Sequence, residues 1–346
     1  MRADGPSTLS QRTQLWGAIA RNQTRLVEAN AELSTGRHYE VNLTLGSNVG
    51  RNLLWRIDIA QLEANQVENE RLLSRAELTQ VTLDTLRDVG NQAIESFIAA
   101  RNSTSNQGVA RRAAESALST VLQALRSTSG EEYLFSGQNA AVPPVTDYQG
   151  GTGQAAVASA FVTTFGIPQS DANVANIGAS AIKAYYDGPF DAVFQDPAWF
   201  ANWSDASVEN QRSRIEGNQF KDLSANANDT SLRQLIKALT AVADSGTDSL
   251  GQEAYQALID KAVSTLKQSE QGITELQARI GEGQSTVRLV NDRLERQVSI
   301  LKSEITRTEG VANEDAALRV NSLMTQLEIS FNITARISQL SILKYI

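Results

Sequence analysis

Apolar residues recur at every seventh position between residues 259 and 301, and this is the strongest pattern in the chain. A second row, three residues after the first, is apolar or small near its middle and polar toward its end. Two such rows form a stripe along one side of an α-helix. The pattern predicts a helix of roughly 65 Å that needs partner helices along its length. The predicted bundle seam consists of Ile259, Leu266, Ile273, Leu276, Ile280, Val287, Val290, Leu294 and Leu301.

Both ends of the chain show the same spacing in a weaker form. Over residues 9–33 one row is apolar, and the other contains the amides Gln23 and Asn30. Isolated helices with so few apolar positions are marginal in water, so we expect both ends to be disordered until something packs on them. Contacts in an assembly are favoured over a loosely specified two-helix contact. The candidate assembly interface comprises Leu9, Trp16, Ile19, Leu26, Leu33, Leu323, Leu327, Phe331, Ile337, Leu340 and Leu343.

The segments between these patterns alternate in character. Helical spacing runs through residues 51–100, beginning with Leu53, Ile57, Ala60 and Ala64, and through 109–130. Residues 39–45 and 131–138 read as short extended pieces. Helical spacing is lost over 139–228, where Gly, Pro, Val, Thr and aromatic residues alternate as in an irregular, partly β insertion. It resumes after Asp229, Thr230 and Ser231, which resemble a helix cap.

The predicted fold is therefore mainly α, a rod of long antiparallel helices with an inserted β-containing middle domain. Three domains are expected. Residues 1–44 and 310–346 form a terminal helical domain, 45–137 and 229–309 form a long-helix bundle, and 138–228 form the insertion.

Seven aromatic residues gather in the expected insertion. The core of a small domain is the favoured interpretation, and an exposed contact surface for a neighbouring subunit or a glycan is the alternative. The cluster consists of Tyr185, Tyr186, Phe190, Phe194, Trp199, Phe200 and Trp203.

Composition removes several classes of function. The net charge is −8 and no run is rich in Lys or Arg, which argues against nucleic acid as a partner. The chain has no Cys and one histidine, His38, so neither a nucleophilic triad nor a histidine-based metal site can be built. We therefore expect no enzyme, no cofactor and no metal. No run approaches the ~20 apolar residues of a membrane span, and the start lacks the apolar core of a secretory signal. The chain is expected to be soluble, or to leave the cell by a route that reads no hydrophobic signal.

Four stretches of the chain carry distinctive motifs. They are residues 33–37 (LSTGR) with 43–46 (LTLG), 130–137 (GEEYLFSG), 187–190 (DGPF) with Trp199 and 202–204 (NWS), and 313–317 (NEDAA) with 327–346. By these motifs the chain resembles the flagellin superfamily, and within it the hook-associated proteins of the hook–filament junction in the form found in alphaproteobacteria. The likeness covers about three quarters of the chain and is weakest across 150–180. The helical ends are shared with filament flagellins, whereas residues 133–137 and the ending 344–346 favour the junction proteins.

This resemblance implies a structural protein that leaves the cell through the flagellar type III apparatus. It would form one ring on the distal hook, with the terminal helices as the inner tube and the middle domain outside. The implied partners are further copies of the chain, a neighbouring hook-associated protein on the hook side, flagellin on the filament side and an export chaperone. Filament flagellin is the nearest alternative, and a soluble coiled-coil interaction module is an alternative from another class.

Overall fold

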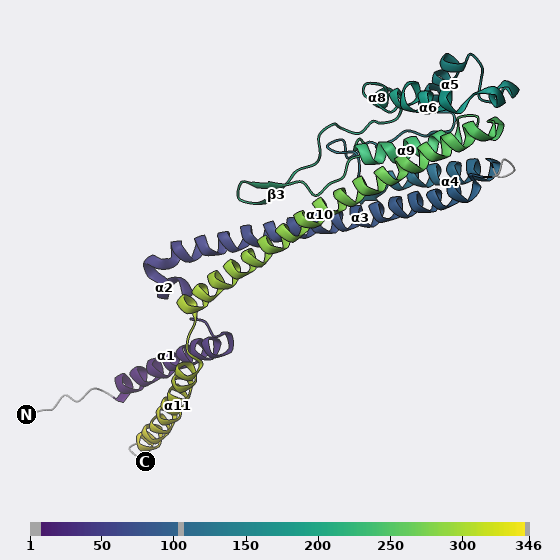
Figure 1. The fold of residues 1–346 in the computed structure, drawn as a ribbon. Helices are drawn as coiled ribbons and strands as arrows, with labels where there is room; N and C mark the ends of the chain where they lie inside the picture. The colour runs from purple at the N-terminus through teal and green to yellow at the C-terminus, as the bar shows by residue number, and fades with distance from the viewer. Residues whose placement is uncertain (1–7, 103–106, 343–346) are drawn as a thin grey trace, which may run out of the picture. The chain divides into compact units, whose positions relative to one another are not determined.

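The computed structural model describes residues 8–102 and 107–342, and the chain divides into two compact units. Unit 1 contains the residues up to Ala64 and from Arg293 onward, and unit 2 contains Asn65–Asp292. Two long helices, α3 (Val49–Ala100) and α10 (Gln252–Glu309), run through both units, so one part of each helix belongs to unit 1 and the other part to unit 2 (Figure 1). The long helix expected over 259–301 is thus present and extends beyond both ends of the pattern.

The predicted seam positions of α10 face inward. Eight of them are buried: Ile259, Leu266, Ile273, Leu276, Ile280, Val287, Val290 and Leu294. The ninth, Leu301, is half-buried. Seven-residue spacing keeps these side chains on one side of the helix, and their burial removes that side from water.

In unit 2, α10 runs antiparallel to α3. The hydroxyl of Tyr255 donates to the carbonyl of Ala100 at 3.2 Å, and Asn69 Nδ2 donates to Asn291 Oδ1 at 2.8 Å. Residues near the end of α3 therefore contact residues near the start of α10, and residues earlier in α3 contact residues later in α10. This is the nested arrangement that the sequence predicts.

Helix α9 (Thr230–Ala243) approaches α10 closely because the facing positions are small. Asp229 caps α9 by accepting a hydrogen bond from the backbone N–H of Ser231, as the sequence indicates. Ser269 Oγ donates to the carbonyl of Ser231 at 2.7 Å, and a Cβ built on Gly272 would lie 2.6 Å from that of Ser231. Helix α4 (Gln107–Leu125) also packs against α9.

Replacing Gly272 with alanine is expected to destabilise unit 2 by about 1–3 kcal/mol, because the added methyl group forces α9 away from α10. Gly281→Ala is the matched control, since the nearest atom to its Cβ would be 3.9 Å away. There the substitution only improves helix propensity and should stabilise by up to about 1 kcal/mol. Urea unfolding of the two variants tests the difference, and equal shifts would contradict the close approach.

The middle of the chain is more helical than its sequence indicates. The loss of helical structure expected over 139–228 is wrong for several segments, because the helices there are short, with 14 residues in the longest, and so few turns do not establish a period. Paired strands occur there as one hairpin, with Ser213 opposite Lys221. The elements are α5 (Thr152–Phe165), η3 (Ala172–Asn176), α6 (Ala179–Asp187), α7 (Pro189–Ala192), α8 (Ala198–Asn202), β3 (Ser213–Glu216) and β4 (Gln219–Lys221).

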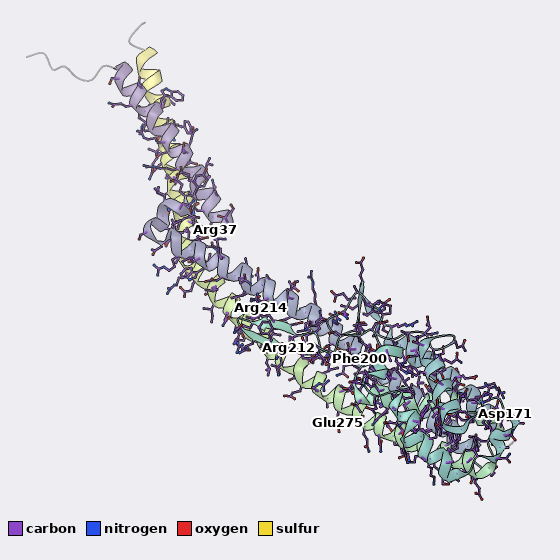
Figure 2. All side chains as sticks on the ribbon, turned by 90° about the horizontal axis from the view of Figure 1, so that it is seen from above. Arg37, Asp171, Phe200, Arg212, Arg214 and Glu275 are labelled. Carbon is purple, nitrogen blue, oxygen red and sulfur yellow. The ribbon has the colours of Figure 1, made fainter. Side chains whose placement is uncertain are left out.

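The aromatic cluster is the core of this region. Its rings form a continuous series of contacts, and Trp203 lies between Phe194 at 4.9 Å and Trp199 at 6.0 Å. Phe200, labelled in Figure 2, is only half-buried. The core interpretation is therefore confirmed, and the contact-surface alternative is wrong for the six buried members: Tyr185, Tyr186, Phe190, Phe194, Trp199 and Trp203.

Residues 130–137 tie the inserted helices to the bundle. Strand β1 (Thr128–Ser129) pairs with β2 (Glu132–Tyr133), so only part of the expected strand forms. Phe135 is buried, and its carbonyl accepts from the N–H of Ala227 at the far end of the insertion. Gly137 has φ +60°, and a Cβ there would lie 2.4 Å from a backbone carbonyl oxygen. This motif therefore requires glycine where the chain enters the insertion.

The extended structure expected over residues 39–45 is wrong. Val41–Leu45 forms helix α2, followed by the 3-10 turn η1 (Gly46–Asn48) and then α3. The N–H groups of Leu43 and Thr44 both bond to the carbonyl of Glu40, and Leu45 is buried. Alternation over so few residues does not distinguish a strand from one helical turn. Another 3-10 turn, η4 (Thr247–Ser249), precedes α10.

Candidate assembly interface of the terminal helices

The two ends of the chain form helices that pack on each other within unit 1. Helix α1 (Thr8–Thr35) contacts α11 (Asn313–Ile342). Ala29, Val320 and Leu323 form a buried cluster, against which Leu26 and Leu33 pack. Part of each apolar face is therefore buried inside a single chain, which corrects the expectation that neither end can do so.

The candidate interface residues divide into two groups. Ile19, Leu323 and Leu327 are buried in the seam between the helices. Leu26, Leu33 and Ile337 are half-buried, whereas Trp16 is 56 % exposed and Phe331 is 47 % exposed. Leu343, together with the side chains of Leu9 and Leu340, lies outside the described residues.

The pair leaves several large apolar side chains in water. They are about half exposed or more and lie on different outer sides of the two helices, and so many of them are unusual for an isolated chain. Such exposed side chains favour a contact with another molecule. The exposed residues are Trp16, Val27, Leu318, Met324, Ile329, Phe331 and Ile333.

The first half of α3 has an exposed apolar side as well. Leu53, Ile57, Ala60 and Ala64, whose spacing predicts this helix, all face solvent in unit 1. The positions that face inward include the polar Asn52. Four residues at helical spacing therefore form an apolar stripe without an internal partner in the described part of the chain.

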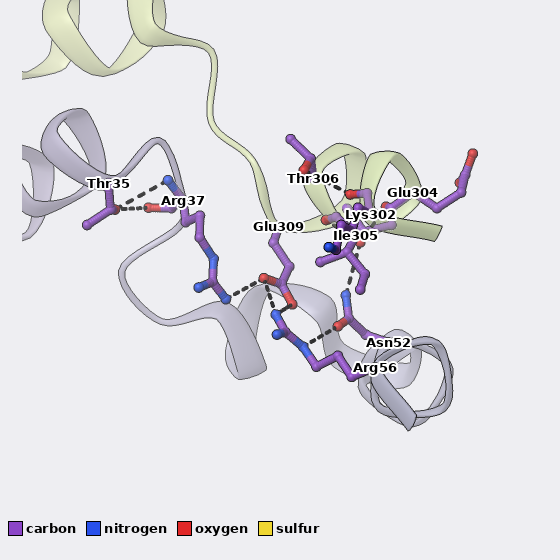
Figure 3. Close-up of polar contacts among 10 residues, drawn as sticks. Thr35, Arg37, Asn52, Arg56, Lys302, Glu304, Ile305, Thr306 and Glu309 are labelled. Atoms are coloured by element: carbon purple, nitrogen blue, oxygen red, sulfur yellow. Dashed lines mark hydrogen bonds and ion pairs between the residues drawn. The ribbon is translucent and has the colours of Figure 1, made fainter. Parts of the chain in front are cut away.

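A buried carboxylate joins the segment that follows α1 to the segment that precedes α11. Glu309, the last residue of α10, has a side chain that is 3 % exposed. Arg56 Nη2 donates to its two oxygens at 2.8 and 2.9 Å, and Arg37 Nη2 donates to Oε2 (Figure 3). The backbone closes the same joint, since His38 N donates to Glu309 O at 3.0 Å and Val311 N donates to Gly36 O at 3.0 Å. We call Arg37, Arg56 and Glu309 the clasp.

The arginines decide the ionisation of Glu309. Burial raises the pKa of this carboxyl, but the hydrogen bonds and positive charges of Arg56 and Arg37 outweigh burial. The result is a pKa below the ordinary value of 4.5. The carboxyl group of Glu309 is therefore ionised at neutral pH.

A second buried glutamate links the terminal helices. Glu32 accepts from Arg319 Nη1 at 2.6 Å and from the N–H of Tyr39 at 3.1 Å. His38 Nδ1 lies 3.5 Å from the same carboxylate. The single histidine of the chain thus lies at this joint.

Within residues 8–102 and 107–342, no group of three or more His, Asp or Glu side chains could hold a metal ion. Asp244 accepts from the hydroxyl of Tyr148 at 2.7 Å, and burial raises the pKa of both groups. This pair connects the insertion to the end of α9. None of the described helices has the length and apolarity to cross a membrane.

Sequence reasoning missed the clasp entirely. Glu309 lies in a stretch that the pattern marks only as a break between two helices, and Arg56 lies in the middle of a helix. Arg37 belongs to the LSTGR motif, which is the one signal that pointed to this place. Two hundred and more residues separate the partners, so spacing in the sequence cannot bring them together.

Comparison with known proteins identifies the family. Residues 7–140 match the bacterial flagellin N-terminal helical region, and residues 254–346 match the bacterial flagellin C-terminal helical region. No curated protein sequence matches the chain.

Two solved structures are similar in part. The crystal structure of Bacillus cereus FlgL is 13 % identical, with a TM-score of 0.48 over 74 % of this chain and 98 % of that chain. A structure described as a flagellar hook-associated protein of Vibrio parahaemolyticus is 9 % identical, with a TM-score of 0.40 over 77 % of this chain and 94 % of that chain. On the two family matches, which together span more than half of the sequence, this chain belongs to the bacterial flagellin family and is a structural protein of the flagellum.

Proposed function

We propose that this chain is the hook-associated protein that connects the hook to the flagellin filament, polymerising through its terminal helices into a ring. The observation that carries the proposal is the apolar surface that unit 1 leaves exposed on α1, α11 and the first half of α3. Flagellin-family proteins self-polymerise and associate with other flagellar components. Burial of these faces against neighbouring subunits is the driving force expected for such an assembly.

One motif favours the junction over the filament. Residues 133–137 resemble the corresponding residues of junction proteins. This motif includes the buried Phe135 and the conformationally required Gly137 at the base of the insertion. We infer a location outside the cell, at the end of the hook, with a hook-associated protein on one side and flagellin on the other. An export chaperone would hold the chain before export.

Deletion of the gene tests this role. A junction protein is required for filament attachment, so the deletion strain should carry hooks without filaments and should release flagellin into the medium. Electron microscopy of the cells and analysis of the medium measure both. If this chain were filament flagellin instead, its loss would leave no released flagellin, and the pure protein would grow long fibres in bulk.

We expect the terminal helices to gain their full order only in the assembly. In the free chain, amides before about Leu45 and after about Gly310 should exchange rapidly with solvent, whereas residues 51–130 and 232–305 should be protected. Hydrogen exchange followed by mass spectrometry measures this. Uniform protection would contradict assembly-coupled folding and would favour a coiled-coil module.

Acid is expected to loosen the clasp. Because the folded pKa of Glu309 lies below 4.5, the clasp contributes its full stability above that pH and loses it as the pH falls through the folded pKa. In isolated flagella, the native chain should be retained better than Glu309→Gln at pH 7, and the two release curves should converge below pH 4.5. Curves that coincide at pH 7, or that stay apart at low pH, would contradict this role of Glu309.

A further inference from the structure

A pocket of about 530 Å³ opens beside the clasp in unit 1. The residues lining it come from the end of α1, from α3, from the end of α10 and from the start of α11. Among these lining residues the charged ones are Arg37, Arg56 and Glu309. The remaining lining residues are neutral, so the clasp determines the electrostatic character of the pocket.

The clasp carries one positive charge in excess. Two guanidinium groups share a single carboxylate that the lowered pKa keeps ionised. Glu309 is buried, whereas the side chains of Arg37 and Arg56 are 50 % and 48 % exposed. Within the described residues, the guanidinium group of Arg37 contacts Glu309 through Nη2 alone. A guanidinium has five N–H donors arranged to bind a planar carboxylate, so this pocket suits a second carboxylate.

The source of that carboxylate follows from charge and position. The chain has 39 acidic and 31 basic residues, so a further copy offers a surplus of Asp and Glu side chains. The pocket also lies next to α1 and α11, whose exposed apolar faces are buried against other copies in the proposed function.

We propose that this pocket receives an Asp or Glu side chain from a second copy of the chain in the assembled ring, an inference that rests on the proposed function. The incoming carboxylate would balance the excess charge of the clasp. Charge-assisted hydrogen bonds of this kind fix the register between subunits. The contact would thus link the joint at the base of the terminal helices of one copy to its neighbour.

The first test uses a chemical cross-link. Arg37→Lys keeps the positive charge and adds an amine, which a carbodiimide joins directly to a carboxylate in contact with it. In isolated flagella we expect a dimer of this chain linked from position 37 to an Asp or Glu of the second copy. Arg126→Lys, which replaces the partner of Asp147 in unit 2, is the control and should give within-chain links only.

The cross-link can also overturn the proposal. Links from position 37 to Glu309 of the same chain alone, or to a different flagellar protein, would do so. Arg56→Lys reports on the same pocket if Arg37→Lys does not enter flagella. Absence of the native chain from isolated flagella would instead refute the proposed function, so the two failures are distinguishable.

The second test removes the excess positive charge of the clasp by replacing Arg37 with an uncharged residue, and it uses no cross-linking. Arg37→Gln removes one partner of Glu309 but leaves Arg56 paired with both of its oxygens, so the free chain should lose only a small part of its stability, which urea unfolding measures. In cells that produce both chains equally, its share of isolated flagella should fall about fivefold. Equal incorporation of the two chains would overturn the proposal. The proposal would also be overturned if the reduced share of the variant in flagella were fully explained by a lower stability of the free variant chain.

Discussion

A chain with Phe331→Asp is expected to fold but to stay out of flagella. Phe331 is 47 % exposed on α11, so the substitution removes little packing from the free chain. In the proposed assembly the remaining exposed half of this side chain is buried, which contributes about 0.7–1.5 kcal/mol, and a carboxylate at the same place would in addition have to lose its hydration. Affinity for the assembly should therefore fall at least about 3- to 12-fold.

Competition with the native chain measures this effect. Both proteins are produced in the same cells, and their ratio in isolated flagella is determined by mass spectrometry. Trp16→Asp on α1 should behave in the same way. Val208→Asp is the control, because Val208 is 76 % exposed in unit 2, away from the proposed interface. Incorporation of Phe331→Asp at the native level would contradict the assignment of this face to assembly.

Replacing Trp203 with alanine should have the largest effect on the stability of unit 2. Trp203 is fully buried and stacks on Tyr148 with ring centroids 5.4 Å apart. A Cβ built on Gly153 would lie 3.1 Å from its ring, so the surrounding structure fits the indole closely. Removing a buried aromatic side chain costs about 3–5 kcal/mol. For a unit of this size, the midpoint of thermal unfolding should fall by about 6–20 °C.

Phe200 provides the matched control for this substitution. It belongs to the same sequence cluster but is half-buried, and its ring lies 5.6 Å from the guanidinium carbon of Arg233. Phe200→Ala should lower the free energy of unfolding by less than about 1.5 kcal/mol. Calorimetry of both variants compares them. Equal losses would mean that the six buried rings do not act as one core.

Periodicity predicted the long helices well because each is longer than ten turns. A seven-residue repeat maintained from Ile259 to Leu301 leaves few alternatives to a helix, and the structure places this stretch within α10. The same reasoning failed over 39–45 and over much of 139–228. The helices there span one to four turns, and their buried residues do not recur at a regular spacing in the sequence.

Periodicity also could not say which way an apolar stripe faces. Leu53 and Ile57 have the spacing expected of an inward face, yet both are exposed, while Asn52 beside them is buried and donates to Thr308 Oγ1 at 3.1 Å. A stripe indicates only that a helix needs a partner. Whether the partner is internal depends on which segments the folded chain brings alongside.

By itself, the sequence determined the helical class, the nested order of the long segments and the membership in the flagellin family, because these depend on repeated local spacing and on continuous motifs. Tertiary structure alone decided that the aromatic cluster is a core, that unit 1 keeps an outward apolar face, and that Arg37 and Arg56 meet Glu309. These features depend on contacts between residues far apart in the chain, and no local pattern encodes such contacts.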